Sequence, residues 1–360
     1  MLTTSILSAI IVLGVLVFAH ELGHFIMAKK LRIGVITFSL GFGPKLVGKK
    51  IGETHYQIAS VPLGGFVKLI GENPDEEIAE EDRHRSFSHA PVWKRAMIVS
   101  AGPIFNFFLA IALFSVVNLF GVPYLPAKIG EMSPGLPAEK AGLKKGDVVL
   151  SVNGEKVQKW DDLSRIIRAS GGKELTLQVR RDGENLDVRV TPRSSKTKNL
   201  FGEEVQILMI GIQPAEEVVN EKVSPVVAVG MGFEQTGSGI KLTLVSIWKL
   251  IERVIPAKTI GGPLMIAQLA GEQAKRGLVS FILFMAILSI NLGVINLFPI
   301  PILDGGHFIF LGLEAILGKP LSMKKMEIAQ QVGLVVIILL MIFAFYNDIV
   351  RIVSPGGLKF

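Results

Sequence analysis

The sequence contains no cysteine, and this absence restricts both its covalent and its metal chemistry. Disulfide bonds and thiolate metal ligands are excluded. A zinc ion would have to be held by histidine and carboxylate side chains. The chain also lacks a basic patch interleaved with aromatic residues, because its net charge of +7 is spread along the sequence. A nucleic-acid partner is therefore not expected.

The features of a cleaved signal peptide are missing as well. Residues 6–18 are apolar, but no basic residue precedes them and no small-residue cleavage site follows. We therefore expect a retained membrane helix of about 25 residues, which is long enough to cross a bilayer.

Apolar residues, by contrast, are abundant. They make up 49% of the chain, and the mean hydropathy is +0.49. The apolar runs cover residues 6–18, 96–122, 278–298 and 332–345. This pattern predicts a polytopic α-helical membrane protein with about four transmembrane helices. These helices would contact the lipid bilayer.

The basic residues between these runs predict the topology. Clusters of lysine and arginine follow the first run, precede the second, and separate the third from the fourth. Since positive loops stay in the cytoplasm, both chain termini and the loop of residues 122–276 are expected on the other side.

The most informative motif is His20-Glu21-Leu22-Gly23-His24, at the end of the first apolar run. Residues i and i+4 of a helix share one face, so both imidazoles can bind one Zn²⁺. Glu21 can then act as the base toward a water on the metal. The alternative is a chance match, but polar groups inside an apolar run are costly and usually functional.

Two histidines leave a catalytic zinc one protein ligand short. The candidate is Asp304, which lies at the same predicted membrane depth as His24 and follows the helix-breaking Pro299 and Pro301. His307 competes for this role, and the plainer alternative is a helix end that Asp304 caps.

The remaining regions are predicted from strand and turn patterns. Residues 34–70 alternate as strands, with a turn at Gly41-Phe42-Gly43-Pro44 and a break at Gly64-Gly65, and form either a sheet beside the site or a separate hairpin. Residues 127–193 predict a small α+β domain with a helix over 160–169 and paired strands over 175–179 and 186–190. Charges within residues 240–255 favour an amphipathic helix at the outer surface.

Several runs together resemble the site-two protease family of intramembrane zinc metalloproteases, within it the bacterial regulator of sigma-E group. They are the motif at 20–24, Asn-x-x-Pro-x-Pro-x-Leu-Asp-Gly at 296–305, Ala-Gly-Pro-x-x-Asn at 101–106, and Gly41-Phe42-Gly43 with the run 62–68. Residues 127–193 resemble a PDZ domain, including Ala-Gly-Leu-x-x-Gly-Asp at 141–147. The well-known bacterial members carry two PDZ domains, whereas this chain has room for one.

The resemblance implies an organisation in seven segments. These are a first transmembrane helix with the zinc motif (1–30), a membrane-associated β-region and loop (31–92), a second transmembrane helix (93–121), one inserted PDZ domain (122–215), amphipathic outer-surface helices (216–276), a third transmembrane helix with the third-ligand motif (277–318), and a loop with the fourth transmembrane helix (319–360).

The resemblance also implies the roles of individual residues. His20, His24 and Asp304 would bind Zn²⁺, and Glu21 would activate the water. Asn296, Pro299 and Pro301 would contact an unwound substrate, as would Gly41, Gly43, Gly64 and Gly65 of the β-region, to whose edge a substrate strand would add.

The resulting functional prediction is an intramembrane zinc metalloendopeptidase of regulated intramembrane proteolysis in the bacterial inner membrane. By resemblance, its substrate is a single-span protein such as a pre-shortened anti-sigma factor, or a remnant signal peptide. The PDZ domain would lie on the periplasmic side and take a peptide C-terminus, and the active site would lie near the cytoplasm. The alternative is a membrane-tethered PDZ scaffold with a structural or vestigial zinc site. A metal transporter is disfavoured, since the second and fourth spans contain almost no polar residues.

Overall fold

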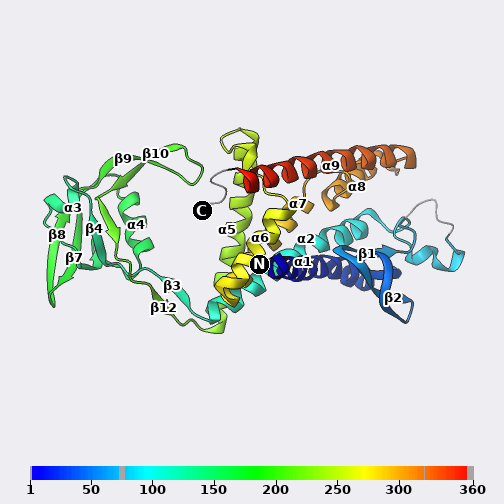
Figure 1. The fold of residues 1–360 in the computed structure, drawn as a ribbon, viewed down its shortest axis with the longest axis horizontal. Coiled ribbons are helices and arrows are strands. Elements are labelled where there is room, and N and C mark those ends of the chain that lie inside the picture. Colours follow the sequence, from blue (N-terminus) through cyan, green and yellow to red (C-terminus); the bar gives the residue numbers. More distant parts are fainter. Residues whose placement is uncertain (1, 73–77, 320, 355–360) are drawn as a thin grey trace. The chain divides into compact units, whose positions relative to one another are not determined.

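The computed structural model describes residues 2–72, 78–319 and 321–354 (Figure 1). Residues 73–77, in the loop predicted after the β-region, and residues 320 and 355–360, in the predicted last segment, lie outside it. The described chain forms two compact units. The first comprises Met1–Val117 and Pro225–Phe360, and the second comprises Asn118–Ser224.

Four helices of the structure are long and apolar enough to cross a membrane. They are α1 (Leu2–Lys30), α2 (Val92–Leu119), α7 (Leu278–Asn296) and α9 (Met323–Val353). Their apolar side chains face outward along much of their length, as hydrocarbon surroundings allow. The described residues thus contain four candidate membrane helices, the number that the apolar runs predict.

Two further helices of the first unit pack against these spans. The helix α6 (Pro263–Arg276) lies against α1, where Ala270 shares a buried cluster with Val12 and Leu16. The helix α5 (Pro225–Ile251) places Gly232 against Ser115 of α2 and Gly239 against Ile290 of α7. The prediction of a helix over residues 240–255 was wrong in its extent, because these glycines weaken the local helix signal while they allow close helix packing.

A turn that contains Pro299 and Pro301 ends the helix of the third apolar run, as these helix-breaking residues predict. The helix α7 ends at Asn296, and α8 (Asp304–Leu317) begins after this turn. The predicted segment 277–318 is thus two helices. A side chain at Gly305 would collide with the carbonyl oxygens of Leu297 and Phe298 in this turn, so the tight turn requires glycine there.

The predicted β-region consists of two bent strands, β1 (Val35–Ile51) and β2 (Thr54–Leu69), near the C-terminal end of α1 (Figure 1). Phe38 pairs with Val67 on one side and with Tyr56 on the other, so β1 lies between two parts of β2. The predicted turn at Gly41–Pro44 is a bend inside β1, where both glycines have positive φ. The tight reversal lies instead between Ile51 and Thr54, which pair directly.

The second unit is built on a four-stranded sheet in the order β6-β5-β7-β8. These strands are β5 (Val148–Val152), β6 (Glu155–Lys156), β7 (Leu175–Arg181) and β8 (Glu184–Val190). Two helices, α3 (Pro137–Lys140) and α4 (Trp160–Ala169), accompany the sheet, and Leu163 and Ile167 of α4 are buried in its core. The predicted helix over 160–169 and the paired strands are confirmed.

Six further strands of this unit have no local signature in the sequence. They pair as β3 (Val122–Tyr124) with β12 (Val219–Glu221), β4 (Ile129–Met132) with β11 (Ile212–Pro214), and β9 (Arg193–Lys198) with β10 (Glu204–Met209). Because β3 and β12 join the two ends of the unit, it continues beyond residue 215 to Ser224. Short 3₁₀ helices, η1 (Glu80–Arg85) and η2 (Ala257–Thr259), lie in loops of the first unit.

Candidate metal centre

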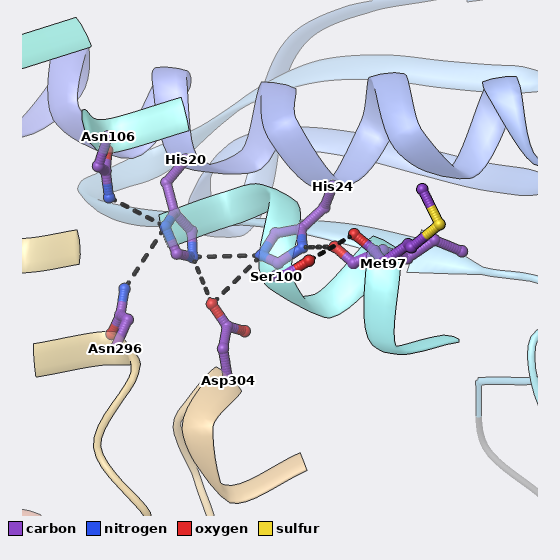
Figure 2. Close-up of polar contacts among 8 residues, drawn as sticks. His20, His24, Met97, Ser100, Asn106, Asn296 and Asp304 are labelled. Atoms are coloured by element: carbon purple, nitrogen blue, oxygen red, sulfur yellow. Dashed lines mark hydrogen bonds and ion pairs between the residues drawn. The ribbon is translucent and has the colours of Figure 1, made fainter. Parts of the chain in front are cut away.

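His20 and His24 lie one turn apart on α1 and present their rings to the same side of the helix (Figure 2). Their ring centroids are 4.8 Å apart, and their Nε2 atoms are 3.2 Å apart. The two Nε2 atoms therefore converge on one point, as the i, i+4 spacing predicts.

Asp304 reaches the same point from the first turn of α8 (Figure 2). Its Oδ2 atom lies 3.2 Å from Nε2 of His20 and 3.5 Å from Nε2 of His24. Among the described residues no side-chain hydrogen bond caps the N-terminus of α8, and the carboxylate of Asp304 faces the histidines instead of capping the helix.

The three atoms form a triangle of the size that a tetrahedral zinc site needs. With Zn–N and Zn–O bonds of about 2.0 to 2.1 Å, neighbouring ligands of a tetrahedron lie about 3.3 Å apart. The observed sides are 3.2, 3.2 and 3.5 Å. Among the described residues, this is the group of histidine and acidic side chains whose ligand atoms gather closely enough for a metal ion.

In each histidine ring the Nδ1 atom faces away from this triangle, and its hydrogen-bond partners lie mainly on α2. Nδ1 of His24 donates to the carbonyl oxygen of Ile98 at 2.8 Å, which leaves Nε2 as the metal-binding nitrogen. Nδ1 of His20 faces the amide groups of Asn106, at 3.1 Å, and of Asn296, at 3.5 Å.

The helix α2 approaches this site at a glycine. A side chain on Gly102 would collide with the rings of both His24 and His20. On α1, a side chain on Gly23 would collide with the backbone of Ala101. The pair of glycines thus lets α2 form one wall of the site.

Glu21 is half-buried and interacts electrostatically with His24, His20 and Asp304. A side chain on Gly65 would touch Cγ of Glu21, so this part of β2 lies directly beside the predicted base. His307 is not part of the ligand group, and its ring packs against Phe310.

The other predicted substrate contacts are spread more widely. Asn296 reaches His20, whereas Gly64 lies against the ring of Phe42. Gly41 and Gly43 lie against Val61 and Ser60, inside the β-region. Pro301 lies against Gly306 in the turn after α7. No close contact of Pro299 with the ligand group is recorded among the described residues.

Sequence reasoning assigned no role to Ile98, Gly102 and Asn106. These three residues follow one another at intervals of four on α2. Ile98 contacts His24 and Asn106 contacts His20, so α1 and α2 run antiparallel at this point, and Gly102 lies between them against both rings. The run 101–106 belongs to the family resemblance, but a backbone carbonyl and a glycine carry no chemical signature of their own.

Comparisons with known proteins show the family of the chain. The model of peptidase family M50 matches residues 8–340. The chain belongs to peptidase family M50. It is 31% identical to the regulator of sigma-W protease RasP of Bacillus subtilis, over 98% of this chain and 100% of that protein. It is 30% identical to the zinc metalloprotease RasP of Oceanobacillus iheyensis, over 97% of this chain and 99% of that protein.

An Agrobacterium fabrum protein, named for an inferred zinc metalloprotease activity, is 37% identical over 98% of this chain and 97% of its own length. Membership of family M50 identifies the protein as a peptidase, and zinc is the metal of the enzymes it resembles.

Proposed function

We propose that this protein is an intramembrane endopeptidase whose zinc ion is held by His20, His24 and Asp304. The observation that carries the proposal is the triangle of Nε2, Nε2 and Oδ2 atoms between the membrane helix α1 and the first turn of α8. A catalytic zinc site has three protein ligands and an open fourth position, which matches this set.

The donor chemistry also fits zinc. Imidazole nitrogen and carboxylate oxygen are common zinc ligands, and the chain has no thiolate. The buried Oδ2 atom of Asp304 lacks a hydrogen-bond donor among the described residues, so a cation is a suitable partner for its charge. Bound there, Zn²⁺ would polarise the scissile carbonyl and lower the pKa of water.

Glu21 is the residue that would handle the proton. Its place beside the ligand group lets its carboxylate take a proton from the attacking water and pass it to the leaving amine. As a zinc ligand, the Oδ2 atom of Asp304 would not be available for this role.

The substrate would be a membrane-spanning protein, such as a pre-shortened anti-sigma factor or a remnant signal peptide. A helical substrate must unwind before its peptide bond can be attacked, because its amides are bonded within the helix. A side chain on Gly65 of β2 would meet Cγ of Glu21, so a substrate strand added to this edge would regain backbone bonds next to the base. Asn296, Pro299 and Pro301 would line the other side, and Gly41, Gly43 and Gly64 would shape the sheet.

For the second unit we propose a PDZ domain that binds a peptide C-terminus. A cavity of about 260 Å³ lies between α4 and the segment of residues 207–214, and its walls combine apolar side chains with Arg168. If the groove takes a C-terminus, a labelled peptide with a free carboxylate should bind, and its amidated form should not. Equal binding of both forms would contradict a carboxylate site.

The topology proposed with this function follows the basic loops. The protein would lie in the bacterial inner membrane, with the second unit on the periplasmic side and the metal centre near the cytoplasm. Such a chain would act in regulated intramembrane proteolysis.

The experiment that tests the function uses the full chain purified in detergent. Bound zinc and cleavage of a tagged single-span substrate are measured for wild type, Glu21→Gln, Asp304→Ala and His307→Ala. We expect Glu21→Gln to retain zinc but lose about 10²- to 10⁴-fold in cleavage rate, the usual contribution of a general base. Asp304→Ala should lose zinc and cleavage together.

His307→Ala is the matched control, since His307 lies in the same helix as Asp304 but outside the ligand group. It should keep its zinc. Normal cleavage by Glu21→Gln would overturn the assignment of this site and favour the scaffold alternative.

A further inference from the structure

We propose that Asn106 of α2 is a positioning residue for the metal centre, whose side-chain oxygen accepts the Nδ1–H of His20 and so fixes Nε2 of that ring toward the metal. The inference rests on the proposed function of His20 as a ligand. It concerns a residue of the second membrane helix that contacts neither substrate nor metal.

The first observation is that Asn106 is fully buried and close to the ring. It has no exposed surface, and its amide nitrogen Nδ2 lies 3.1 Å from Nδ1 of His20 (Figure 2). The other amide near this nitrogen, that of Asn296, is more distant at 3.5 Å.

The second observation is an unpaired buried atom on the same side chain. Within the described part of the chain, Oδ1 of Asn106 has no hydrogen-bond donor. Leaving a buried polar atom unpaired destabilises a fold, so such an atom usually has a role.

These observations are connected by the chemistry of imidazole. A neutral ring that gives Nε2 to a metal carries its hydrogen on Nδ1, which then needs an acceptor. The amide nitrogen of Asn106 is a donor and cannot accept this hydrogen. A half-turn of the amide brings Oδ1, the unpaired acceptor, to Nδ1.

The backbone around Asn106 keeps its Cα in place for this bond. Its carbonyl oxygen accepts a 2.7 Å hydrogen bond from the buried Ser289 of α7. The same face of α2 supplies the carbonyl of Ile98 to Nδ1 of His24. One helix face therefore provides both acceptors, a carbonyl for one ring and an amide oxygen for the other.

The test compares two nearly isosteric substitutions in the full-length protein. Asn106→Asp keeps an oxygen acceptor, whereas Asn106→Leu has none. The Zn²⁺ dissociation constant is measured by competition with a chromophoric chelator, and the Co²⁺-loaded protein is examined for its d–d absorption. Ser115→Ala, a buried polar change further along α2, is the matched control.

We expect Asn106→Leu to weaken zinc binding 10- to 100-fold, the usual effect of losing such a partner, and to change the Co²⁺ spectrum. Asn106→Asp and Ser115→Ala should bind zinc like wild type. Asn106→Ala, which adds no bulk, should reproduce the loss seen with leucine and serves if the leucine variant does not fold.

The inference is overturned if Asn106→Ala or Asn106→Leu binds zinc as tightly as wild type. It is equally overturned if Asn106→Asp is as weak as these variants, since an acceptor then does not rescue the site. A wild-type protein that binds no Zn²⁺ would instead refute the proposed function on which the inference rests.

Discussion

Arg95, in the first turn of α2, forms a two-point ion pair with Glu314 near the end of α8. Nη1 of Arg95 lies 2.9 Å from Oε2 of Glu314, and both side chains are largely buried. The helix α8 begins with Asp304, so this pair holds the helix that carries the third candidate ligand against the helix that contacts both histidines.

The first prediction concerns this pair. Glu314→Leu alone leaves the Arg95 charge buried without its partner, and a broken buried pair costs roughly 3 to 5 kcal/mol. Replacing both partners, as Arg95→Met with Glu314→Leu, removes the unpaired charge. We expect the single variant to have a clearly lower unfolding temperature in detergent and the double variant to recover most of the loss. A double variant less stable than the single one would show that the pair is not the source of the effect.

A second prediction follows from the close approach of α2 to the histidine rings. Gly102→Ala would place a methyl group in collision with both imidazoles, so the rings or the helix must shift. We expect zinc affinity to fall 10- to 100-fold, as when ring orientation is disturbed, with a matching loss of cleavage.

The control for this prediction is Gly14→Ala on α1. Apart from its chain neighbours and the local backbone of α1, no described atom lies within 4 Å of the position that its side chain would take. It should bind zinc normally, and alanine also favours the helix. Zinc titration of both variants, side by side, separates a local collision from a general intolerance of glycine replacement.

Local patterns predicted much of this fold. The predicted strands over 175–179 and 186–190 pair with each other, and α4 covers the predicted residues 160–169. The membrane helices follow directly from hydropathy. The gathering of His20, His24 and Asp304 agrees with the prediction made from motif spacing and from the expected membrane depth.

What the sequence could not reveal depends on contacts between distant residues. The strands β3 and β12 are short, and their pairing has no periodicity of its own. The carbonyl of Ile98 and the missing side chain of Gly102 become part of the metal centre only when α2 packs on α1. The sequence did not indicate where α5 begins, because the glycines that allow it to pack closely on other helices also weaken the local helix signal.

A third prediction concerns Asp348, which caps α6 from another helix. Its carboxylate oxygens accept the backbone N–H groups of Gly262 and Met265, each at 3.0 Å, at the N-terminus of α6. Asp348→Ala removes this cap, which typically costs about 0.5 to 2 kcal/mol. Faster hydrogen exchange over residues 265–276 is expected, without loss of zinc.

Glu327→Ala, an exposed acidic change on the same helix α9, is the control and should leave this exchange unchanged. If hydrogen exchange over residues 265–276 is equally fast in the two variants, Asp348 does not stabilise α6.

The last prediction is a pH dependence in the second unit, where Arg181 donates to both carboxylate oxygens of the buried Asp147 at 2.8 and 2.7 Å. Burial raises the pKa of Asp147, but hydrogen bonds from Arg181 and from the amide of Lys144 lower it more, so the pKa lies below its usual value. The ionised carboxylate therefore stabilises the fold above the unfolded pKa of about 4, and this stabilisation is lost as the pH falls through the lowered pKa.

Trp160 packs against the core of this unit and can report its unfolding, once Trp93 and Trp248 are replaced by phenylalanine. In that background, Arg181→Gln should lower the unfolding temperature at pH 7, and the difference from its parent should shrink as the pH falls below about 4. Arg180→Gln, a change at the exposed neighbouring residue, should have little effect at either pH. A difference for Arg181→Gln that stays constant across this range would mean that the ionisation of Asp147 does not stabilise the unit.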